Sequence, residues 1–313
     1  MVKKLNIVFM GSPDFAVPSL KKLHQSSHKI CAVVTGTDKK RGRGSALSPT
    51  PVKETSIALN IPVIEADSMH STELHEALLS LKPDLFVVVA FKILPDAMLR
   101  IPAIGSVNLH ASLLPKYRGA APIHHAVMQG ETETGCTIFM LDSGMDTGGI
   151  IAQNSISIGQ DETTGSVYTR LMESGSDVLR AAVDAIADGT YTLQKQDDTQ
   201  ATKAPKLFDE HCKVDFNRPA QVVHNHIRGL SPFPCAYAIL DGKKIKLLQS
   251  SIQISSDEKI ESGKMFIEGN HVFVGCDDKP LCLLTIQVEG KRAMSAIDFM
   301  RGYSGSGKLQ KPD

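Results

Sequence analysis

Residues 85–91 read Leu-Phe-Val-Val-Val-Ala-Phe, the longest uninterrupted apolar run of the chain. A strand with one face in water carries polar residues at every second position, whereas this run carries none on either face. The run therefore predicts a central strand of a parallel sheet, covered on both sides. It is too short to cross a membrane, which takes about 20 apolar residues.

Similar but shorter runs lie at residues 5–10 and 30–35, and segments with helical patterns separate the three runs. These helical segments cover residues 19–25, 51–60 and 71–81. Strands and helices in alternation predict an α/β domain with an open, mostly parallel sheet covered by helices. We expect further strands at 105–110, 136–142 and 150–158, and further helices near 122–129 and over 161–187. Thr163 or Thr164 could cap the last helix and Gly189 could stop it.

The pattern changes after residue 189. Residues 190–208 are polar without sustained periodicity, which is typical of an interdomain linker. A helix at 219–228 then precedes short strands, and Asp241-Gly242 between two such strands indicates a hairpin. We therefore expect a first domain over 1–189, a linker over 190–208 and a smaller β-barrel over 209–313, although composition does not separate a barrel from a sandwich.

Length, charge and cysteine content limit the classes of protein to which the chain can belong. A chain of 313 residues has room for two domains, and 34 basic residues balance 34 acidic ones, so net charge gives no support for a nucleic-acid partner. The six cysteines form no Cys-x-x-Cys pair, which favours reduced thiols in a cytoplasmic protein. His124 and His125 would point about 100° apart on a helix, so we expect no metal there.

Gly11 follows the first predicted strand and precedes a helix. A dinucleotide-binding turn needs Gly-x-Gly-x-x-Gly, and only the first glycine of that pattern is present. The turn predicts a tight strand-to-helix connection rather than a nicotinamide site.

Two polar residues stand in the predicted strand Val107-Asn-Leu-His110. Residues two apart on a strand point to the same face, so Asn108 and His110 lie side by side. Polar groups at the end of an apolar strand are costly to bury without partners. They are either a satisfied pair within a turn or the wall of a site that receives a polar ligand.

Several motifs favour the second interpretation. Asn108-x-His-x-Ser-Leu-Leu-Pro115, Tyr117-Arg-Gly-Ala-Ala-Pro122 and Asp142-x-Gly-x-Asp-Thr-Gly148 follow one another, and Ser231-Pro-Phe-Pro234 stands in the second predicted domain. Together they resemble the folate-dependent formyltransferases, and within that family the enzymes that act on methionyl-tRNA. Further pieces of the resemblance, from Phe9–Ala16 to Gln287–Lys291, cover nearly the whole chain.

The resemblance implies a Rossmann-like formyltransferase domain, an OB-like β-barrel and the co-substrate 10-formyltetrahydrofolate. It implies that Asn108, His110 and Asp146 are catalytic. An amine that attacks a formyl carbon develops an oxyanion, which the Asn108 amide and a ring N–H of His110 could stabilise. The amine must also lose a proton, and an imidazole beside a carboxylate suits that transfer.

The resemblance also implies which residues contact the co-substrate. These are Phe91, Lys92, Ile93 and Leu94 after the central strand, the turn Ser112, Leu113, Leu114 and Pro115, and Asp142. The loop over 91–95 is one residue shorter than the loop usual among the tRNA enzymes of the family. The carboxyl ends of strands in an open α/β sheet are where such ligands bind.

The basic loop Lys39-Lys-Arg-Gly-Arg-Gly44 has two interpretations. Such a run is usually a solvated loop, but its cations also suit phosphate contact. By the resemblance Lys39, Lys40, Arg41 and Arg43 would contact the initiator methionyl-tRNA, with Lys206, Lys243, Lys244 and Lys246 as further candidates in the second domain.

Three functions stay open on the sequence. The first is formyl transfer to methionyl-tRNA by a cytoplasmic monomer without a metal or a membrane contact. The second is formyl transfer to a small amine, such as a sugar nucleotide or a ribonucleotide. The third is an RNA-binding protein that has kept the fold without catalysis, and the intact polar set Asn108, His110 and Asp146 argues against it.

Overall fold

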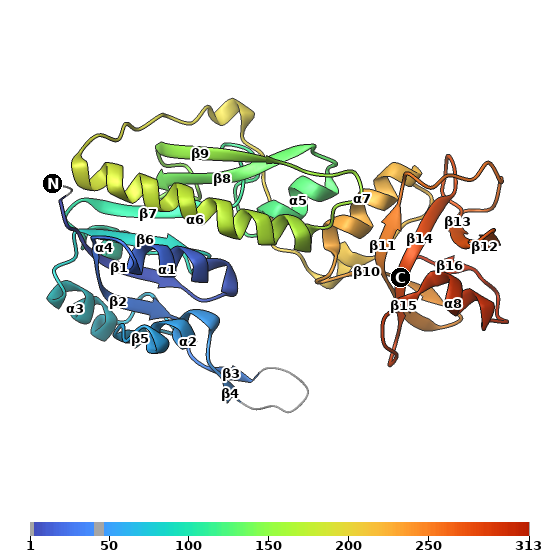
Figure 1. Ribbon diagram of the computed structural model, residues 1–313, viewed down its shortest axis with the longest axis horizontal. Helices are drawn as coiled ribbons and strands as arrows, with labels where there is room; N and C mark the ends of the chain where they lie inside the picture. Colours follow the sequence, from blue (N-terminus) through green and yellow to red (C-terminus); the bar gives the residue numbers. More distant parts are fainter. Residues whose placement is uncertain (1–2, 41–46, 313) are drawn as a thin grey trace. The chain divides into compact units, whose positions relative to one another are not determined.

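The computed structural model describes residues 3–40 and 47–312 (Figure 1). The chain forms two compact units. The first contains residues 1–119, 135–156 and 169–203, and the second contains residues 120–134, 157–168 and 204–313. The chain thus passes between the units several times, and the predicted linker contributes residues 190–203 to the first and 204–208 to the second.

The first unit is built on a seven-stranded sheet with the order β5-β2-β1-β6-β7-β8-β9. Its strands are β1 (Asn6–Gly11), β2 (Lys29–Thr35), β5 (Val63–Glu65), β6 (Leu85–Val89), β7 (Gly105–His110), β8 (Glu133–Met140) and β9 (Ile150–Ser157). The strands from β5 to β7 pair in parallel, and β8 is antiparallel to β7. The expected open and mostly parallel sheet is confirmed.

Helices cover both faces of this sheet. They are α1 (Val17–His24), α2 (Pro51–Ala58), α3 (Thr72–Ser80), α4 (Asp96–Leu99) and α6 (Thr164–Asp188). Side chains of α3 and α4 pack with Val8, Phe86 and Val88 on one face. On the other face α6 approaches β7 so closely that a Cβ on Gly175 would lie 3.3 Å from the Leu109 side chain.

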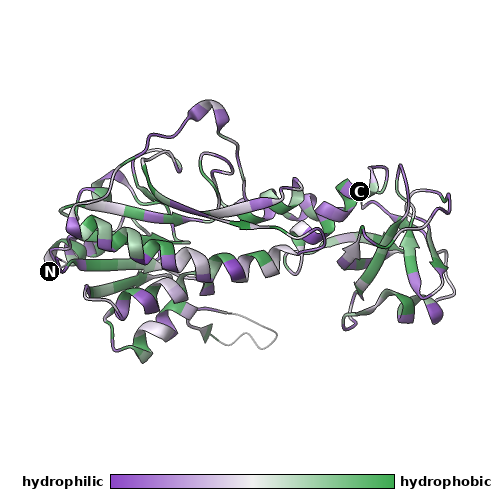
Figure 2. Ribbon diagram, turned by 45° about the horizontal axis from the view of Figure 1, so that its top comes forward, coloured by the Kyte–Doolittle hydropathy of each residue, from purple (hydrophilic) through white to green (hydrophobic). Residues whose placement is uncertain are grey.

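The central position predicted for the strand over residues 85–90 is confirmed, although the strand ends at Val89 and Ala90 already belongs to the following loop. All five residues of β6 are buried, and the strand lies between β1 and β7 with parallel pairing on both sides. Figure 2 shows the central strands coloured as hydrophobic, whereas the long helix α6 carries both colours. Burying side chains of this size contributes about 1.5–3 kcal/mol each, so β6 is a main source of stability for the unit.

Short elements were not expected from the sequence. The two-residue strands β3 (Lys39–Lys40) and β4 (Leu47–Ser48) pair with each other, β5 forms the edge of the main sheet, and α4 follows the loop after β6. Such short elements lack the length that periodicity needs, so only tertiary pairing reveals them. No helix in the described ranges is long and apolar enough to span a membrane.

The second unit contains an antiparallel sheet with the order β12-β13-β14-β11-β10-β16, to which β15 adds beside β14. Its elements are α5 (Pro122–Met128), α7 (Ala220–Leu230), β10 (Ala236–Leu240), β11 (Lys243–Ser251), β12 (Met265–Glu268), β13 (His271–Val274), β14 (Leu281–Val288), β15 (Met294–Ser295), α8 (Ala296–Arg301) and β16 (Leu309–Gln310). The predicted hairpin joins β10 to β11, and Asp241 and Gly242 have φ of 46° and 76°. Positive φ at both central residues is the signature of a type I′ turn.

Hydrogen bonds between the two ends of this sheet close it into a barrel. The amide of Met265 donates to the Gly307 carbonyl at 2.7 Å, and the amide of Leu309 donates to the Gly263 carbonyl at 2.7 Å. Gly263 has φ +81°, and a Cβ there would lie 2.3 Å from the Leu309 oxygen, so the closure requires glycine. The structure therefore shows that the sheet forms a barrel, which composition alone did not distinguish from a sandwich.

Helix α7 carries two histidines whose pKa values are lowered. His224 is fully buried and bonds the Ser250 hydroxyl at 2.8 Å and the Gln160 carbonyl at 2.9 Å. Desolvation lowers the pKa of His226 to about 4, and its Nε2 has no hydrogen-bond partner among the described residues. Helix α7 therefore favours neutral rings at both positions.

This arrangement predicts acid sensitivity. Because the folded-state pKa of His226 lies below its ordinary value of 6.5, its contribution to stability is present above about pH 6.5 and is lost as the pH falls toward 4. Urea unfolding of wild type and His226→Leu at pH 7.5 and pH 5 should show that the variant loses less free energy of unfolding on acidification. At still lower pH the two proteins should differ in this loss by at most about 3 kcal/mol. An equal loss in both proteins would contradict the prediction.

Candidate active site

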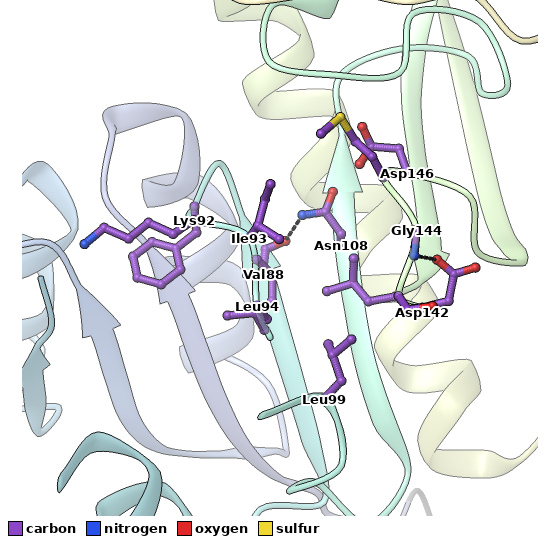
Figure 3. Close-up of a pocket in the computed structure, with 13 residues that line it drawn as sticks. Val88, Lys92, Ile93, Leu94, Leu99, Asn108, Asp142, Gly144 and Asp146 are labelled. Carbon is purple, nitrogen blue, oxygen red and sulfur yellow. Dashed lines mark hydrogen bonds between the residues drawn. The ribbon is translucent and has the colours of Figure 1, made fainter. Parts of the chain in front are cut away.

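A cavity of about 240 Å³ lies beside the ends of β6 and β7 in the first unit (Figure 3). Its walls come from β6 and the loop after it, helix α4, strand β7, and the loop between β8 and β9. The lining residues are Val88, Phe91, Lys92, Ile93, Leu94, Leu99, Asn108, Leu141, Asp142, Ser143, Gly144, Met145 and Asp146. The structure thus brings together predicted residues that stand up to 55 positions apart in the sequence.

The loop after β6 lines the cavity with apolar groups. Ala90 turns the chain with φ +47°, and Phe91 to Leu94 follow. The ammonium of Lys92 donates to the carbonyls of Ala66 at 2.8 Å and Asp67 at 2.5 Å. In Figure 3 this amine points away from Asn108. Lys92 therefore presents its stem and backbone to the cavity, while its charge is occupied elsewhere.

The loop over residues 141–149 runs along β7. At one end the Leu141 amide donates to the Ser106 carbonyl at 2.7 Å, and the Asp142 carboxylate accepts from the Gly144 amide at 3.0 Å and the Thr147 hydroxyl at 2.7 Å. The carboxylate of Asp142 thus holds the shape of the loop. Near the other end Asp146 has φ +57°, a left-handed conformation that is unusual for a residue with a side chain.

His110 and Asp146 meet at that end. Nδ1 of the buried His110 lies 3.7 Å from Oδ2 of Asp146, and Nε2 lies 2.8 Å from the Tyr117 carbonyl oxygen. A carbonyl only accepts hydrogen bonds, so Nε2 carries a proton. Nδ1, on the carboxylate side, is the ring nitrogen left to take up or release one. Oδ2 of Asp146 also accepts from the Gly119 amide at 2.8 Å.

Asn108 stands beside this pair on the same strand. Its Nδ2 donates to the Val88 carbonyl of the neighbouring strand at 3.2 Å. Figure 3 shows the amide nitrogen turned toward Val88 and the oxygen turned away from it. A primary amide has two N–H groups, so one remains for a ligand in the cavity. The expected common face of Asn108 and His110 is consistent with this geometry.

The turn Ser112–Pro115 is well anchored but does not line the cavity. The Thr137 hydroxyl donates to the Ser112 carbonyl at 2.7 Å and accepts from the Leu114 amide at 3.1 Å. Gln153 donates to the Leu114 carbonyl at 3.0 Å and to Thr137 at 2.8 Å. Leu114 is buried, and Leu113 and Pro115 are half-buried. The predicted contact of these four residues with a ligand stays a prediction.

Two supporting residues carry no signal in the sequence. Gln196 is 5% exposed and donates to the backbone carbonyls of Asp146 and Gly148, and its side-chain oxygen accepts from Arg118. Gln196 lies in a polar segment without periodicity, so only the tertiary structure shows that it is buried. Arg118 lies within the motif Tyr117–Pro122, but the side chains that it contacts are about 80 residues away in the sequence.

The cations expected to contact RNA have different surroundings. Lys39 is exposed, Lys40 stands next to it in β3, and Arg41 and Arg43 lie outside the described residues. In the second unit Lys206 is exposed, with Nζ 5.6 Å from the centre of the Phe208 ring.

The barrel carries the other candidate cations. Lys243 is exposed, and Lys244 and Lys246 line a second cavity of about 240 Å³ with residues 287–290. Lys244 is engaged by Asp209 at 3.2 Å and by the Tyr237 ring at 3.4 Å. Among the described residues no group of three or more His, Cys, Asp or Glu side chains could hold a metal ion.

Comparison with known families agrees with this geometry. Residues 3–183 match the formyl transferase family, and residues 206–304 match the formyl transferase C-terminal domain. The chain belongs to the formyl transferase family.

Relatives and solved structures extend the comparison. The chain is 41% identical over 304 residues to the methionyl-tRNA formyltransferase of Chlorobium luteolum, covering 96% of this chain and 97% of the relative. It is 42% identical over 303 residues to that of Geobacter metallireducens, covering 95% and 96%. The crystal structure of the sugar 3N-formyl transferase WlaRD is similar in fold, with a TM-score of 0.66 at 20% identity over 92% of this chain and 99% of the other.

The anchoring of the Ser112–Pro115 turn yields a prediction about stability. Thr137→Val removes a buried hydroxyl that donates once and accepts twice, so we expect a loss of about 1–3 kcal/mol in the free energy of unfolding by urea. Thr137→Ser keeps the hydroxyl and should lose less. A variant with valine as stable as the one with serine would contradict the assigned role of the hydroxyl.

Proposed function

We propose that this chain transfers a formyl group from 10-formyltetrahydrofolate to the amine of methionine esterified to initiator tRNA, in the cytoplasm. The observation that carries the proposal is the similarity to methionyl-tRNA formyltransferases at about 40% identity over nearly the full length of both chains. The similarity extends over both units of the chain. The product would be formylmethionyl-tRNA for translation initiation.

The cavity suits the pterin part of a folate. Its walls are apolar at Val88, Leu94 and Leu99, and a polar edge stands at Asn108 and Asp146. Two exposed apolar side chains at the cavity, Ile93 at 77% and Met145 at 60%, would be covered by a bound ring. Apolar walls with a few placed polar groups are typical of small-molecule sites. A folate bound there supplies the activated formyl group, while the protein supplies position and charge.

We assign Asn108 the role of a donor to the formyl oxygen. One N–H of its amide is held by the Val88 carbonyl, so the side chain is fixed before a substrate arrives. Donors that are already aimed at an oxygen on which negative charge develops lower the barrier without reorganising. His110 can donate to the same oxygen only through Nδ1, because its Nε2 proton is committed to Tyr117.

We assign proton transfer to His110 and Asp146 together. The attacking α-amine has an ordinary pKa of about 8, so part of it is neutral at neutral pH and needs only to lose a proton as the new bond forms. Nδ1 of His110 and Oδ2 of Asp146 lie 3.7 Å apart and can share that proton. The pair would then pass it to the folate nitrogen as the bond between that nitrogen and the formyl carbon breaks, which releases tetrahydrofolate. The Gly119 amide holds Oδ2 in place during the transfer.

We further propose that the second unit and the basic loop bind the tRNA. The exposed Lys39 and Lys206 offer positive charge, and phosphate contacts of this kind make affinity dependent on salt. Lys246 borders the second cavity and has no ion pair among the described residues, whereas Lys244 already has an acidic partner in Asp209. Lys246 is therefore a better candidate for a phosphate contact than Lys244.

The decisive experiment compares acceptors at equal concentration. The full chain is given 10-formyltetrahydrofolate with charged initiator methionyl-tRNA, free methionine, an amino-sugar nucleotide or a ribonucleotide amine. We expect formyl transfer to methionyl-tRNA at least about 100-fold faster than to the other amines, since the tRNA has a far larger surface outside the reacting amine to supply binding energy. Transfer to a small amine with none to methionyl-tRNA would overturn the proposed acceptor but not the catalytic residues.

Asp146→Asn tests the proton transfer. The amide keeps the size of the side chain but cannot accept a proton, so we expect turnover to fall about 10²- to 10⁴-fold with the fold intact. Circular dichroism monitors the fold, and Asp188→Asn on the exposed end of α6 serves as the matched control with unchanged turnover. Turnover near that of the control would refute the role of Asp146.

A further inference from the structure

We infer that Gln196 is a positioning residue that holds the Asp146 carboxylate against His110, an inference that rests on the proposed catalytic role of Asp146. Gln196 is not among the residues that line the cavity, so it would act through the backbone around Asp146 rather than on a substrate. Nothing in the local sequence Leu-Gln-Lys-Gln196-Asp-Asp marks it for that role.

The side-chain amide of Gln196 has only one possible orientation. Its Nε2 donates to the Asp146 carbonyl at 2.9 Å and to the Gly148 carbonyl at 2.8 Å. Its Oε1 accepts from Nε and Nη2 of Arg118 at 3.1 and 2.7 Å. Carbonyls only accept and a guanidinium only donates, so turning the amide over would break all four hydrogen bonds. A buried amide with every such bond made is rigid.

The two carbonyls that Gln196 binds lie on either side of Thr147, at the point where the loop leaves the cavity. Asp146 adopts φ +57°, and a residue with a side chain keeps such a conformation only where its surroundings hold it. Gly148 is confined too, because a Cβ there would lie 1.7 Å from the Met140 oxygen. The two hydrogen bonds from Gln196 hold the backbone directly at the unfavourable turn that carries the carboxylate, beside the contacts that Asp142 and Gly119 make with the same loop.

Through its hydrogen bonds with Arg118, Gln196 is also connected to the segment that contacts His110 and Asp146. Arg118 stands between Tyr117, whose carbonyl accepts from His110, and Gly119, whose amide donates to Asp146. The amide of Gln196 thus ties the segment 117–119 to the loop 146–148. One side chain thereby links the two backbone segments that contact His110 and carry Asp146.

The segment around Gln196 is itself held firmly. Gln194 exchanges two backbone hydrogen bonds of 2.8 Å with Ile150 at the start of β9. Farther along, Thr202 accepts from the Arg118 amide through its carbonyl at 2.9 Å and from the Tyr117 amide through its hydroxyl at 2.8 Å. The residues 194–202 are thus a strap across the loops of the active site, with Gln196 as its contact to Asp146.

The first experiment replaces Gln196 in the full chain and separates kcat from KM. Gln196→Leu should lower kcat for formyl transfer to methionyl-tRNA about 10- to 100-fold, since a misplacement of about 1 Å can have that effect, with little change in the KM for the folate. Gln194→Leu, two residues away with an exposed side chain, is the matched control and should keep its kcat. Unchanged kcat in a folded Gln196→Leu protein would overturn the inference.

A second variant keeps the test informative if leucine disturbs folding. Gln196→Glu retains an acceptor for Arg118 but replaces the donor to Asp146 and Gly148 with an acceptor. It should therefore lose kcat as the leucine variant does, with thermal unfolding monitored by circular dichroism. A glutamate variant with normal kcat would overturn the inference, because the donated hydrogen bonds would then have no role.

The double variant distinguishes positioning of Asp146 from a general effect on the fold. If Gln196 acts through the Asp146 carboxylate, adding Gln196→Leu to Asp146→Asn should lower the single-turnover rate by less than about 3-fold, since groups that act as a unit are not additive. Additive losses would overturn the inference. A fully active Asp146→Asn enzyme would instead refute the proposed role of Asp146. If Asp146→Asn is inactive while Gln196→Leu is fully active, only the positioning role of Gln196 is refuted.

Discussion

Burial of β6 on both faces constrains the first unit more than any other feature. Its five apolar residues can leave water only if helices cover both sides of the sheet, and its backbone groups can be satisfied only by a strand on each edge. Parallel pairing with β1 and β7 then brings the carboxyl ends of β6 and β7 to one edge. The loop Phe91–Leu94 and the side chain of Asn108 meet there, and the cavity follows from that meeting.

The polar side chains of the site form hydrogen bonds with backbone groups, so few of their donors and acceptors remain for the substrate. Asn108 gives one N–H to Val88, His110 gives Nε2–H to Tyr117, and Asp146 accepts from Gly119. Each bond removes a possible orientation, because backbone carbonyls and amides have fixed roles as acceptors and donors. The atoms left over, one N–H of Asn108 and Nδ1 of His110, are used in the proposed reaction together with the Asp146 carboxylate.

The sequence predicted what local pattern determines and missed what distant contacts determine. The apolar run at 85–91 predicted the central strand, Asp241-Gly242 predicted the hairpin, and the strand around Asn108 predicted its common face with His110, since each rests on neighbouring residues. Barrel closure and the burial of Gln196 depend on partners about 45 and 50 residues away, for which no periodicity exists. The 3.7 Å approach of His110 to Asp146 was implied by resemblance alone.

The path of the chain limits how the function of the second unit can be studied. Helix α5 belongs to the second unit although it lies between segments of the first in sequence, and it packs against α7 so closely that a Cβ on Gly229 would lie 2.3 Å from the Met128 side chain. A chain ending at residue 208 would expose that face of α5 and remove the partners of residues 159–162, which α7 binds through His224 and Arg228. Lost activity after such a truncation would therefore report damage to the remaining chain as much as a lost tRNA contact. Point substitutions of exposed cations in the full chain avoid that ambiguity, because they leave the interface between α5 and α7 intact.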